Sequence, residues 1–349
     1  MNIDLRSLAA FRILLGLYFA WDVYSRVSFG RWDLAWYTSG EDSSYLDPND
    51  TPHRGFLHRL WFYRGTTLEQ SVIFLLTFCC AMGYTLGLSD ILAVPLWFLV
   101  TANQNRNMHV HDGSDNFSRQ LLLWTCFLPM AKVWKFRNKQ PHRGSVVVSS
   151  VAAYGLATQI LLMYLGTVFH RTIDLYGFDQ VHKSEWLPPR LEAAHYALSG
   201  SFSVRENIIN QLVQGSPTLS RGMTLAAMMA EFCCPILLFV LRPRFRLPFA
   251  IILVGLHGGL LVSMRLPHWQ LVTIAAHLTL WVPSHLWDYY SARRSSGSQK
   301  DKSSSLPLQH SLHHRSNLFT RGIAAVLMLY MLLNFAGERR WIKKFDNGE

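Results

Sequence analysis

Long apolar stretches without any charged residue recur along the chain and are separated by short polar segments. Six such stretches are Gln70–Ser89, Ile91–Asn105, Gly144–His170, Leu247–Met264, Leu266–Trp287 and Gly322–Gly337. A helix needs about 20 mostly apolar residues to cross the roughly 30 Å hydrocarbon core of a bilayer. Because the stretches reach or approach that length, the pattern predicts membrane-spanning helices. A soluble domain would have to bury all of these stretches in one small core.

Three further apolar stretches are interrupted or short: Leu8–Val27 with Arg12 and Asp22, Gly222–Leu241 with Glu231, and Leu121–Ala131. The last of them can span a membrane only if its helix extends from Phe117 to Trp134. With these three, the pattern predicts about nine spans. The expected fold class is all-α: a polytopic transmembrane helical bundle of about 8–9 helices, with outer-side loops that form a cleft.

The charges are few but strongly unbalanced. Charged residues make up 16% of the chain and the net charge is +11, whereas an average soluble domain has about 25% charged residues. Three segments, 132–143, 242–246 and 288–317, together carry a net charge of +11. Cytoplasmic loops of membrane proteins are rich in Lys and Arg, so we expect these segments and the N-terminus on the cytoplasmic side. The side of the basic C-terminal tail stays open, because the number of spans places it outside.

The position of the basic residues also indicates their partner. They lie at the ends of the predicted spans rather than on a soluble face with interleaved aromatic residues, so the expected partner is the lipid bilayer and not nucleic acid. Residues 1–290 are predicted to form the transmembrane domain, and residues 318–349 a final hydrophobic helix with a basic tail. Residues 291–317 between them are predicted to be a flexible cytoplasmic linker, because they are rich in Ser, Lys and His.

Three charged side chains (Arg12, Asp22 and Glu231) and two mid-span histidines (His257 and His277) stand out inside the predicted spans. A charge at this depth costs about 2.5–3.5 kcal/mol on insertion scales, so it faces the bundle interior and has a partner. Arg12 and Asp22 are too far apart on one helix to pair, which predicts partners on other helices. Each of these residues fits either an interhelical contact or a substrate or proton site. The glycines beside His257 allow a close approach of a helix or a cofactor.

Two outer loops contain titratable residues. The third loop contains His109, His111 and Asp112, a spacing that suits a metal ion, but a turn followed by a helix capped by Asp115 explains the same residues without metal. We therefore predict no metal. The fifth loop begins at His170 and contains further ionisable residues as far as Trp186. It fits either an ordinary solvated loop or an interfacial segment that opens a cleft toward the outer leaflet.

Several motifs occur in the order found in one membrane protein family. They are Asn107 followed by Asp112-Gly113-Ser114-Asp115, Gln159 with Tyr164, Glu231 with Pro235, His257, and Trp281-Val282-Pro283. With the opening helix around Arg12, this chain resembles the HTTM family, the membrane domain shared with vitamin K-dependent gamma-carboxylases. The resemblance covers roughly residues 4–290. It implies a helical bundle whose active cleft faces the lumenal or outer side.

The resemblance also implies a site. It assigns cofactor-binding roles to Asp112, Asp115, Gln159, Tyr164, Glu231 and His257, with a reduced quinone of the vitamin K or menaquinone type as the cofactor. In the carboxylases, a lysine after the helix that contains the Gln and Tyr deprotonates vitamin K hydroquinone. The matching residue here is Arg171, which stays protonated and cannot act as a general base. Lys183 from a shifted position, or the neighbouring His170, is the alternative base.

Three hypotheses follow for the function. The chain binds or acts on a lipophilic quinone or lipid without carboxylation, or it is a quinol-dependent glutamate carboxylase that acts on a secreted polypeptide. The third hypothesis is a non-enzymatic membrane protein for scaffolding, export or immunity. Whether the chain is an enzyme is left open by the sequence. Catalytic roles, where present, are expected at His170, Arg171 and Lys183.

Overall fold

The computed structural model describes residues 2–28, 67–105, 113–136, 147–199, 204–205, 207–265, 267–296 and 326. Three groups of residues from the sequence analysis lie outside these ranges: the third-loop residues His109, His111 and Asp112, the greater part of the predicted linker 291–317, and nearly all of the stretch Gly322–Gly337.

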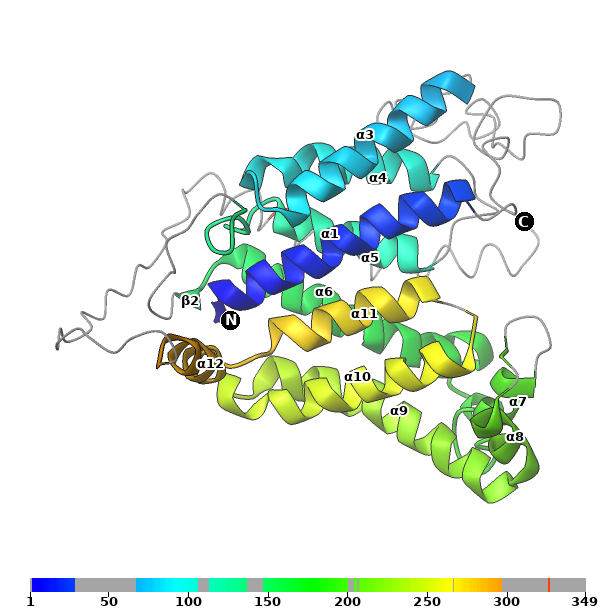
Figure 1. Ribbon diagram of the computed structural model, residues 1–349. Coiled ribbons are helices and arrows are strands. Elements are labelled where there is room, and N and C mark those ends of the chain that lie inside the picture. The colour runs from blue at the N-terminus through cyan, green and yellow to red at the C-terminus, as the bar shows by residue number, and fades with distance from the viewer. Residues whose placement is uncertain are drawn as a thin grey trace. The chain divides into compact units, whose positions relative to one another are not determined.

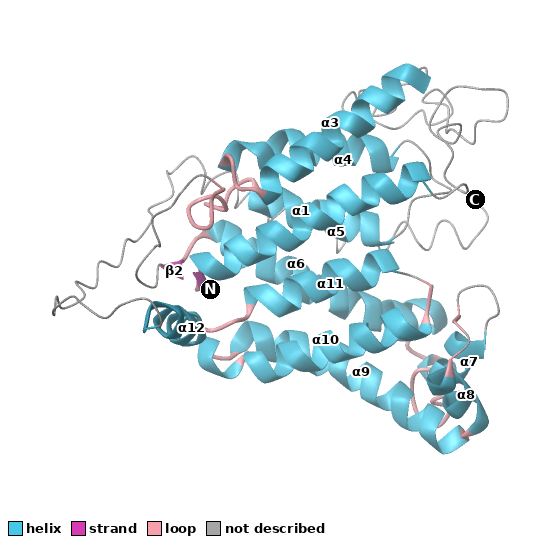
Figure 2. Cartoon of the chain, viewed as in Figure 1, coloured by secondary structure: helices cyan, strands magenta, loops and turns pink. Residues whose placement is uncertain are grey.

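The described chain is mostly helical, as predicted (Figures 1 and 2). Its α-helices are α1 (Leu5–Ser28), α3 (Thr67–Thr85), α4 (Ala93–Asn105), α5 (Gly113–Thr125), α6 (Val151–Phe169), α7 (Ala193–Ser199), α8 (Ile208–Gly215), α9 (Pro217–Val240), α10 (Leu247–Ser263), α11 (Pro267–Leu280) and α12 (Ser284–Ser296). Short 3-10 helices occupy Asp90–Leu92, Val181–Lys183 and Pro243–Phe245, and a π-helix covers His170–Asp174. The strands β1 (Ile3–Asp4) and β2 (Val147–Val148) form an antiparallel pair with Ile3 opposite Val148.

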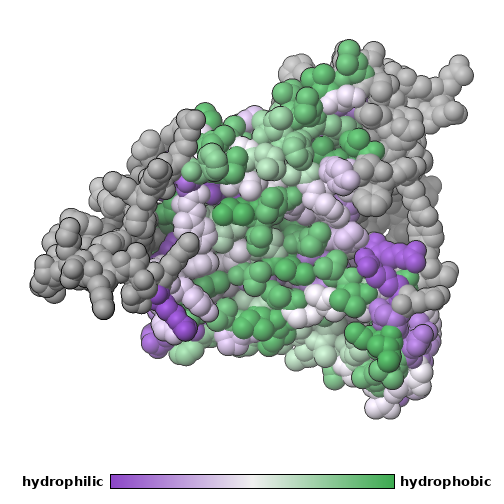
Figure 3. Space-filling view, in the orientation of Figure 1, coloured by the Kyte–Doolittle hydropathy of each residue, from purple (hydrophilic) through white to green (hydrophobic). Residues whose placement is uncertain are grey.

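Three helical segments are long and apolar enough to cross a membrane: Leu5–Val27, Val151–Asp174 and Pro217–Val240. Two shorter apolar helices cover Gln70–Thr85 and Leu247–Ser263. Apolar side chains such as Ile251 and Ile252 are exposed on α10, and Figure 3 shows apolar residues over much of the visible helical surface. These features support membrane association, whereas the number of spans and the orientation of the N-terminus stay predictions.

Two of the predicted spans are not continuous helices. Within Leu266–Trp287, α11 ends at Leu280 and α12 begins at Ser284. Pro283 interrupts the helix because it lacks a backbone N–H, and the 14 residues of α11 extend only about 21 Å. The predicted helix from Phe117 to Trp134 is also wrong, because α5 ends at Thr125 and turns follow.

Two compact units make up the described chain. One consists of residues 5–143, and the other of residues 1–4 with 144–349. The first unit contains α1, α3, α4 and α5, and the second contains α6 to α12 together with the two strands. In the second unit, side-chain caps fix where two long helices begin: Ser150 accepts from the N–H of Ala153 at the start of α6, and Ser216 accepts from Leu219 at the start of α9.

Arg12 is bound by backbone carbonyls in the first unit. Its Nη1 donates to the carbonyl oxygens of Met130 (2.8 Å) and Val133 (3.3 Å), and its Nη2 donates to that of Trp134 (2.8 Å). The turns after α5 thus supply the partners of this buried cation. Gly87, with φ of +67°, lies directly against the guanidinium. We call this arrangement the Arg12 cage.

The partner of Asp22 differs from the prediction. Asp22 Oδ1 accepts from Arg26 Nε (2.9 Å), one turn further along α1, and Arg26 Nη2 also contacts Asp115 Oδ1 (2.6 Å). This partner of Asp22 lies on its own helix, whereas the prediction placed its partners on other helices. Arg26, which the hydropathy pattern places at the end of the span, links both carboxylates, and all three side chains are buried.

Close packing of α1 against α3 depends on Gly16. A Cβ atom at this position would lie 3.1 Å from both the Ala81 carbonyl oxygen and the Thr85 backbone nitrogen. We expect Gly16→Ala to destabilise the protein by about 1–3 kcal/mol, the usual cost of overpacking. Gly259→Ala on α10 is the control, because a Cβ there meets nothing within 4 Å. Thermal unfolding in detergent checks the pair, and equal melting temperatures for both variants would contradict this packing.

Candidate functional site

A buried tyrosine bridges two histidines in the second unit. The Tyr164 hydroxyl lies 2.5 Å from Nε2 of His257 and 2.9 Å from Nε2 of His277. The three residues come from α6, α10 and α11, and each is 1% exposed. Because a buried polar group without a partner costs free energy, these mutual hydrogen bonds explain how three polar side chains persist between apolar helices.

Further hydrogen bonds extend the Tyr164 bridge toward both ends of α11. His257 Nδ1 lies 2.6 Å from Oε1 of Gln270, and the indole N–H of Trp281 donates to Nδ1 of His277 (3.1 Å). Gln270 and Trp281 are eleven residues apart, so the series extends over about 16 Å of helix length. We call Gln270, His257, Tyr164, His277 and Trp281, joined by four hydrogen bonds, the polar chain.

A buried ion pair lies beside the polar chain. Arg171 Nη1 donates to Oε2 of Glu231, and the Glu231 side chain is 6% exposed whereas that of Arg171 is 28% exposed. The Arg171 guanidinium also lies 4.1 Å from the centroid of the Trp186 ring, and the Ser184 hydroxyl donates to the Arg171 carbonyl oxygen (2.8 Å). Arg171 is therefore fixed by a carboxylate on one side and an aromatic face on the other.

The ion pair and the polar chain belong to helices that pack against one another. Glu231 lies on α9, which packs against both α6, the helix of Tyr164, and α10, the helix of His257. We call the polar chain together with Arg171 and Glu231 the Tyr164 cluster. It offers a carboxylate, a hydroxyl, two imidazoles and a partly exposed cation, which is a set of groups that can bind a polar headgroup and move a proton.

The structure brings together four of the residues that the sequence singled out for the site: Arg171, Tyr164, Glu231 and His257. Gln159 is also buried on α6. Two of the other candidates lie on the surface: His170 is exposed at the end of α6, and the amine of the exposed Lys183 donates to Gln180 (3.0 Å). Asp115 belongs to the first unit, where it contacts Arg26, and Asp112 lies outside the described residues.

Gln270 and Trp281 were not assigned to the site from the sequence. Gln270 gives a weak signal, since it is a polar residue near the start of an otherwise apolar stretch. For the glycines beside His257, the structure bears only on the close approach of a helix, and the approach of a cofactor stays a prediction. A Cβ at Gly255, Gly258 or Gly259 would meet nothing within 4 Å, so no helix or other part of the described chain approaches closely there.

Among the described residues, no three His, Cys, Asp or Glu side chains lie together so that they could hold a metal ion. The histidines of the Tyr164 cluster use their ring nitrogens for hydrogen bonds to protein side chains. The chemistry available to these residues is therefore hydrogen bonding and proton transfer.

A half-buried network of hydrogen bonds and ion pairs holds the loop after α6. The Tyr176 hydroxyl donates to Oε2 of Glu185 (2.6 Å), and Arg190 contacts both Glu185 and Glu192 (2.9 and 3.0 Å). The hydrogen bond from Tyr176, with a smaller contribution from Arg190, lowers the pKa of Glu185 below its ordinary value of 4.5. The network orders the segment that places Trp186 against Arg171.

This pKa shift predicts a response to pH. Because the pKa of Glu185 is lowered on folding, its stabilising contribution is present above pH 4.5 and is lost as the pH falls through the lowered value. We expect Tyr176→Phe to raise the pKa of Glu185 toward 4.5, because the strongest hydrogen bond to the carboxylate is removed. A carboxyl-carbon NMR titration measures this, and an unchanged midpoint would contradict the hydrogen bond.

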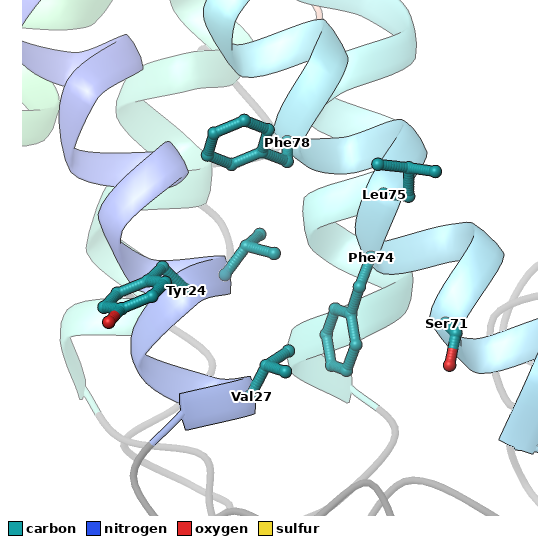
Figure 4. Close-up of a pocket in the computed structure, with 7 residues that line it drawn as sticks. Tyr24, Val27, Ser71, Phe74, Leu75 and Phe78 are labelled. Atoms are coloured by element: carbon teal, nitrogen blue, oxygen red, sulfur yellow. The ribbon is translucent and has the colours of Figure 1, made fainter.

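An apolar groove lies between α1 and α3 in the first unit (Figure 4). Tyr24 and Val27 of α1 and Phe74, Leu75 and Phe78 of α3 line it, with Ser71 at one end. Its lining carries no ionisable group except the Tyr24 phenol. The groove suits an acyl chain by shape and polarity, but it lacks the acid–base groups that distinguish the Tyr164 cluster.

No protein-family model matches this chain, and no curated protein or solved structure is similar to it. The resemblance to the HTTM family therefore stays a prediction that depends on the motifs in the sequence.

Proposed function

We propose that this chain is a multi-pass membrane protein of the HTTM type that binds a lipophilic substrate of the quinone or lipid class at the Tyr164 cluster. One observation carries the proposal: the hydroxyl of a tyrosine that is 1% exposed bridges two imidazoles among apolar helices. Ionisable side chains inside membrane segments are costly and are most often functional.

The groups of the Tyr164 cluster fit a quinone-type ligand. A reduced quinone carries two phenolic hydroxyls and an apolar tail, and it supplies reducing electrons and acidic protons when it is bound. When their mutual hydrogen bond opens, Tyr164 offers a donor and His257 Nε2 an acceptor for such hydroxyls. Apolar residues on the surrounding helices suit the tail. Arg171, whose side chain is 28% exposed, marks the end of the cluster nearest the surface.

The contacts of Arg171 and Lys183 bear on the carboxylase alternative, which needs a base near this position. Arg171 stands at the position of the carboxylase base but is paired with Glu231 and lies against Trp186. An arginine stays protonated, so it cannot remove the proton of a quinol. Lys183 donates to Gln180 on the exposed loop. Within our proposal, His257 and Tyr164 abstract the proton. Arg171 orients Glu231 and attracts an anionic group.

A binding experiment tests the proposal. The purified protein in lipid nanodiscs is mixed with menaquinone-4, its reduced form, or a phospholipid of the bacterial type, and thermal stability and tryptophan fluorescence are recorded. We expect at least one of these ligands to stabilise the wild type and to lose its effect in Tyr164→Phe. Tyr154→Phe is the matched control, because Tyr154 lies on the same helix with 45% exposure.

The outcomes separate the alternatives. Stabilisation that survives Tyr164→Phe would place the ligand elsewhere, and no stabilisation by any of the ligands would overturn the proposal. A parallel reaction with labelled bicarbonate and a glutamate-rich peptide reports on carboxylation. Incorporation of the label into the peptide, together with formation of quinone epoxide, would contradict our proposal and support the carboxylase alternative.

A further inference from the structure

The polar chain has a fixed direction, because one of its ends can only donate. The indole N–H of Trp281 has no lone pair that accepts a hydrogen bond, so in its contact with His277 Nδ1 the histidine must be the acceptor. His277 Nδ1 therefore carries no proton. In the neutral ring, the proton is then on Nε2, the atom that faces the Tyr164 hydroxyl.

The same reasoning assigns every other proton in the polar chain. His277 Nε2–H donates to the Tyr164 oxygen, so the Tyr164 proton points toward the second neighbour, His257 Nε2, only 2.5 Å away. His257 Nε2 accepts, which places the His257 proton on Nδ1. That proton faces Oε1 of Gln270, which is an acceptor. All four hydrogen bonds are satisfied in this one direction, and reversing any of them leaves two donors or two acceptors facing each other.

Packing holds the donating end in place. Trp281 is 4% exposed at the end of α11, and the guanidinium of Arg246 lies 5.7 Å from the centroid of its ring. Arg246 is itself buried and donates from Nε to the Leu241 carbonyl oxygen (2.9 Å). The indole ring is thus fixed on its face by a cation and at its edge by His277, so the direction of the polar chain is built into the fold.

We propose that Trp281 is a positioning residue that orders the protons of the polar chain and makes Tyr164 and His257 its acid–base couple. In this couple, the O–H bond of Tyr164 breaks as an N–H bond forms at His257 Nε2, without a change in net charge. The N–H of His277 stabilises the resulting phenolate oxygen, and Gln270 accepts from the imidazolium. The use of this couple on a substrate rests on the proposed function, whereas the proton order does not.

The order also limits what the polar chain can do. Neither the indole N–H of Trp281 nor the amide of Gln270 passes a proton on, so the polar chain stores a transferable proton between Tyr164 and His257 and does not conduct protons through the bundle. This distinguishes it from the proton relays of pumps, which contain carboxylates or histidines along the whole path.

Nitrogen-15 NMR of histidine-labelled protein, recorded without any quinone, tests the proposal. Protonated and unprotonated ring nitrogens have well-separated chemical shifts, and the signals are assigned from the variants His257→Gln and His277→Gln. We expect His277 protonated at Nε2 and His257 protonated at Nδ1. The opposite tautomer at either histidine would overturn the proposal. Since no ligand is added, this outcome is independent of the substrate-binding experiment.

Variants test the role of Trp281 directly. In Trp281→Phe we expect His277 to lose its single tautomer and His257 to change with it, whereas Trp97→Phe, in the other unit, leaves both unchanged. His277→Gln can keep the order, because its amide offers an acceptor to Trp281 and a donor to Tyr164; His277→Leu cannot. The His257 tautomer should therefore survive His277→Gln and change in His277→Leu. Unchanged spectra in both Trp281→Phe and His277→Leu would contradict a positioning role.

Discussion

Arg171→Leu is expected to destabilise the protein by about 3 kcal/mol, near the lower end of the cost of breaking a buried ion pair. The change leaves the carboxylate of Glu231, 6% exposed, without its counter-charge. Glu231→Gln is expected to cost less, about 1 kcal/mol, because Arg171 is 28% exposed and can reach water or lipid headgroups. Unfolding in detergent with increasing denaturant measures both values.

The double variant Arg171→Leu, Glu231→Leu provides the sharper control. Replacing both partners by apolar residues removes the uncompensated charge, so we expect it to be more stable than Arg171→Leu alone. Arg190→Leu, which removes the more exposed contacts with Glu185 and Glu192, should cost much less than Arg171→Leu, because ion pairs near the surface contribute little. Equal losses for Arg171→Leu and Arg190→Leu would contradict a buried, cluster-forming ion pair.

Gly87→Ala in the Arg12 cage is expected to cost about 2–5 kcal/mol, the sum of a left-handed backbone penalty and overpacking. Gly87 has φ of +67°, and a Cβ there would lie 2.6 Å from Cζ of Arg12. The guanidinium has no room to move, because backbone carbonyls of Met130 and Trp134 bind it. The prediction is checked by thermal unfolding and by the yield of folded protein.

Gly177→Ala is the matched control for Gly87→Ala. Its φ is +73°, so it has a similar backbone penalty, but its Cβ would approach only Oδ1 of the exposed Asp179, at 2.9 Å. That side chain can rotate away, and we expect a loss of about 1–2 kcal/mol. The difference between the two variants isolates the contact with Arg12. No difference between them would mean that the cage does not hold the guanidinium tightly.

Much of the helical architecture follows from the apolar pattern of the sequence. The stretches around α1, α6, α9 and α10 predict helices, because only a helix satisfies its own backbone within a long apolar segment. The points at which these helices end are harder to predict. Pro283 marks the end of α11, but the end of α5 at Thr125 depends on turns whose carbonyl groups bind Arg12, and backbone acceptors leave no pattern in the side chains.

Some members of the Tyr164 cluster are predictable from the sequence, but the hydrogen bonds that connect them are not. Glu231 and His257 stand out because polar groups are costly inside apolar stretches, and Tyr164 only because the resemblance to the HTTM family singles it out together with Gln159. The partners Gln270 and Trp281 depend on how α10 and α11 are rotated about their axes, which the sequence leaves open. Trp186 contacts Arg171 across fifteen positions of chain because the intervening loop folds back, and no spacing rule indicates that.

Photo-cross-linking tests the location of the site most directly. A quinone analogue with a diazirine on its ring is irradiated with the protein in nanodiscs, and the labelled peptides are identified by mass spectrometry. We predict labelling of peptides from α6, α9 and α10 around Tyr164, Glu231 and His257, which excess menaquinone-4 suppresses. Suppressible labelling confined to the groove lined by Tyr24 and Phe78, or no suppressible labelling at all, would contradict the Tyr164 cluster as the binding site.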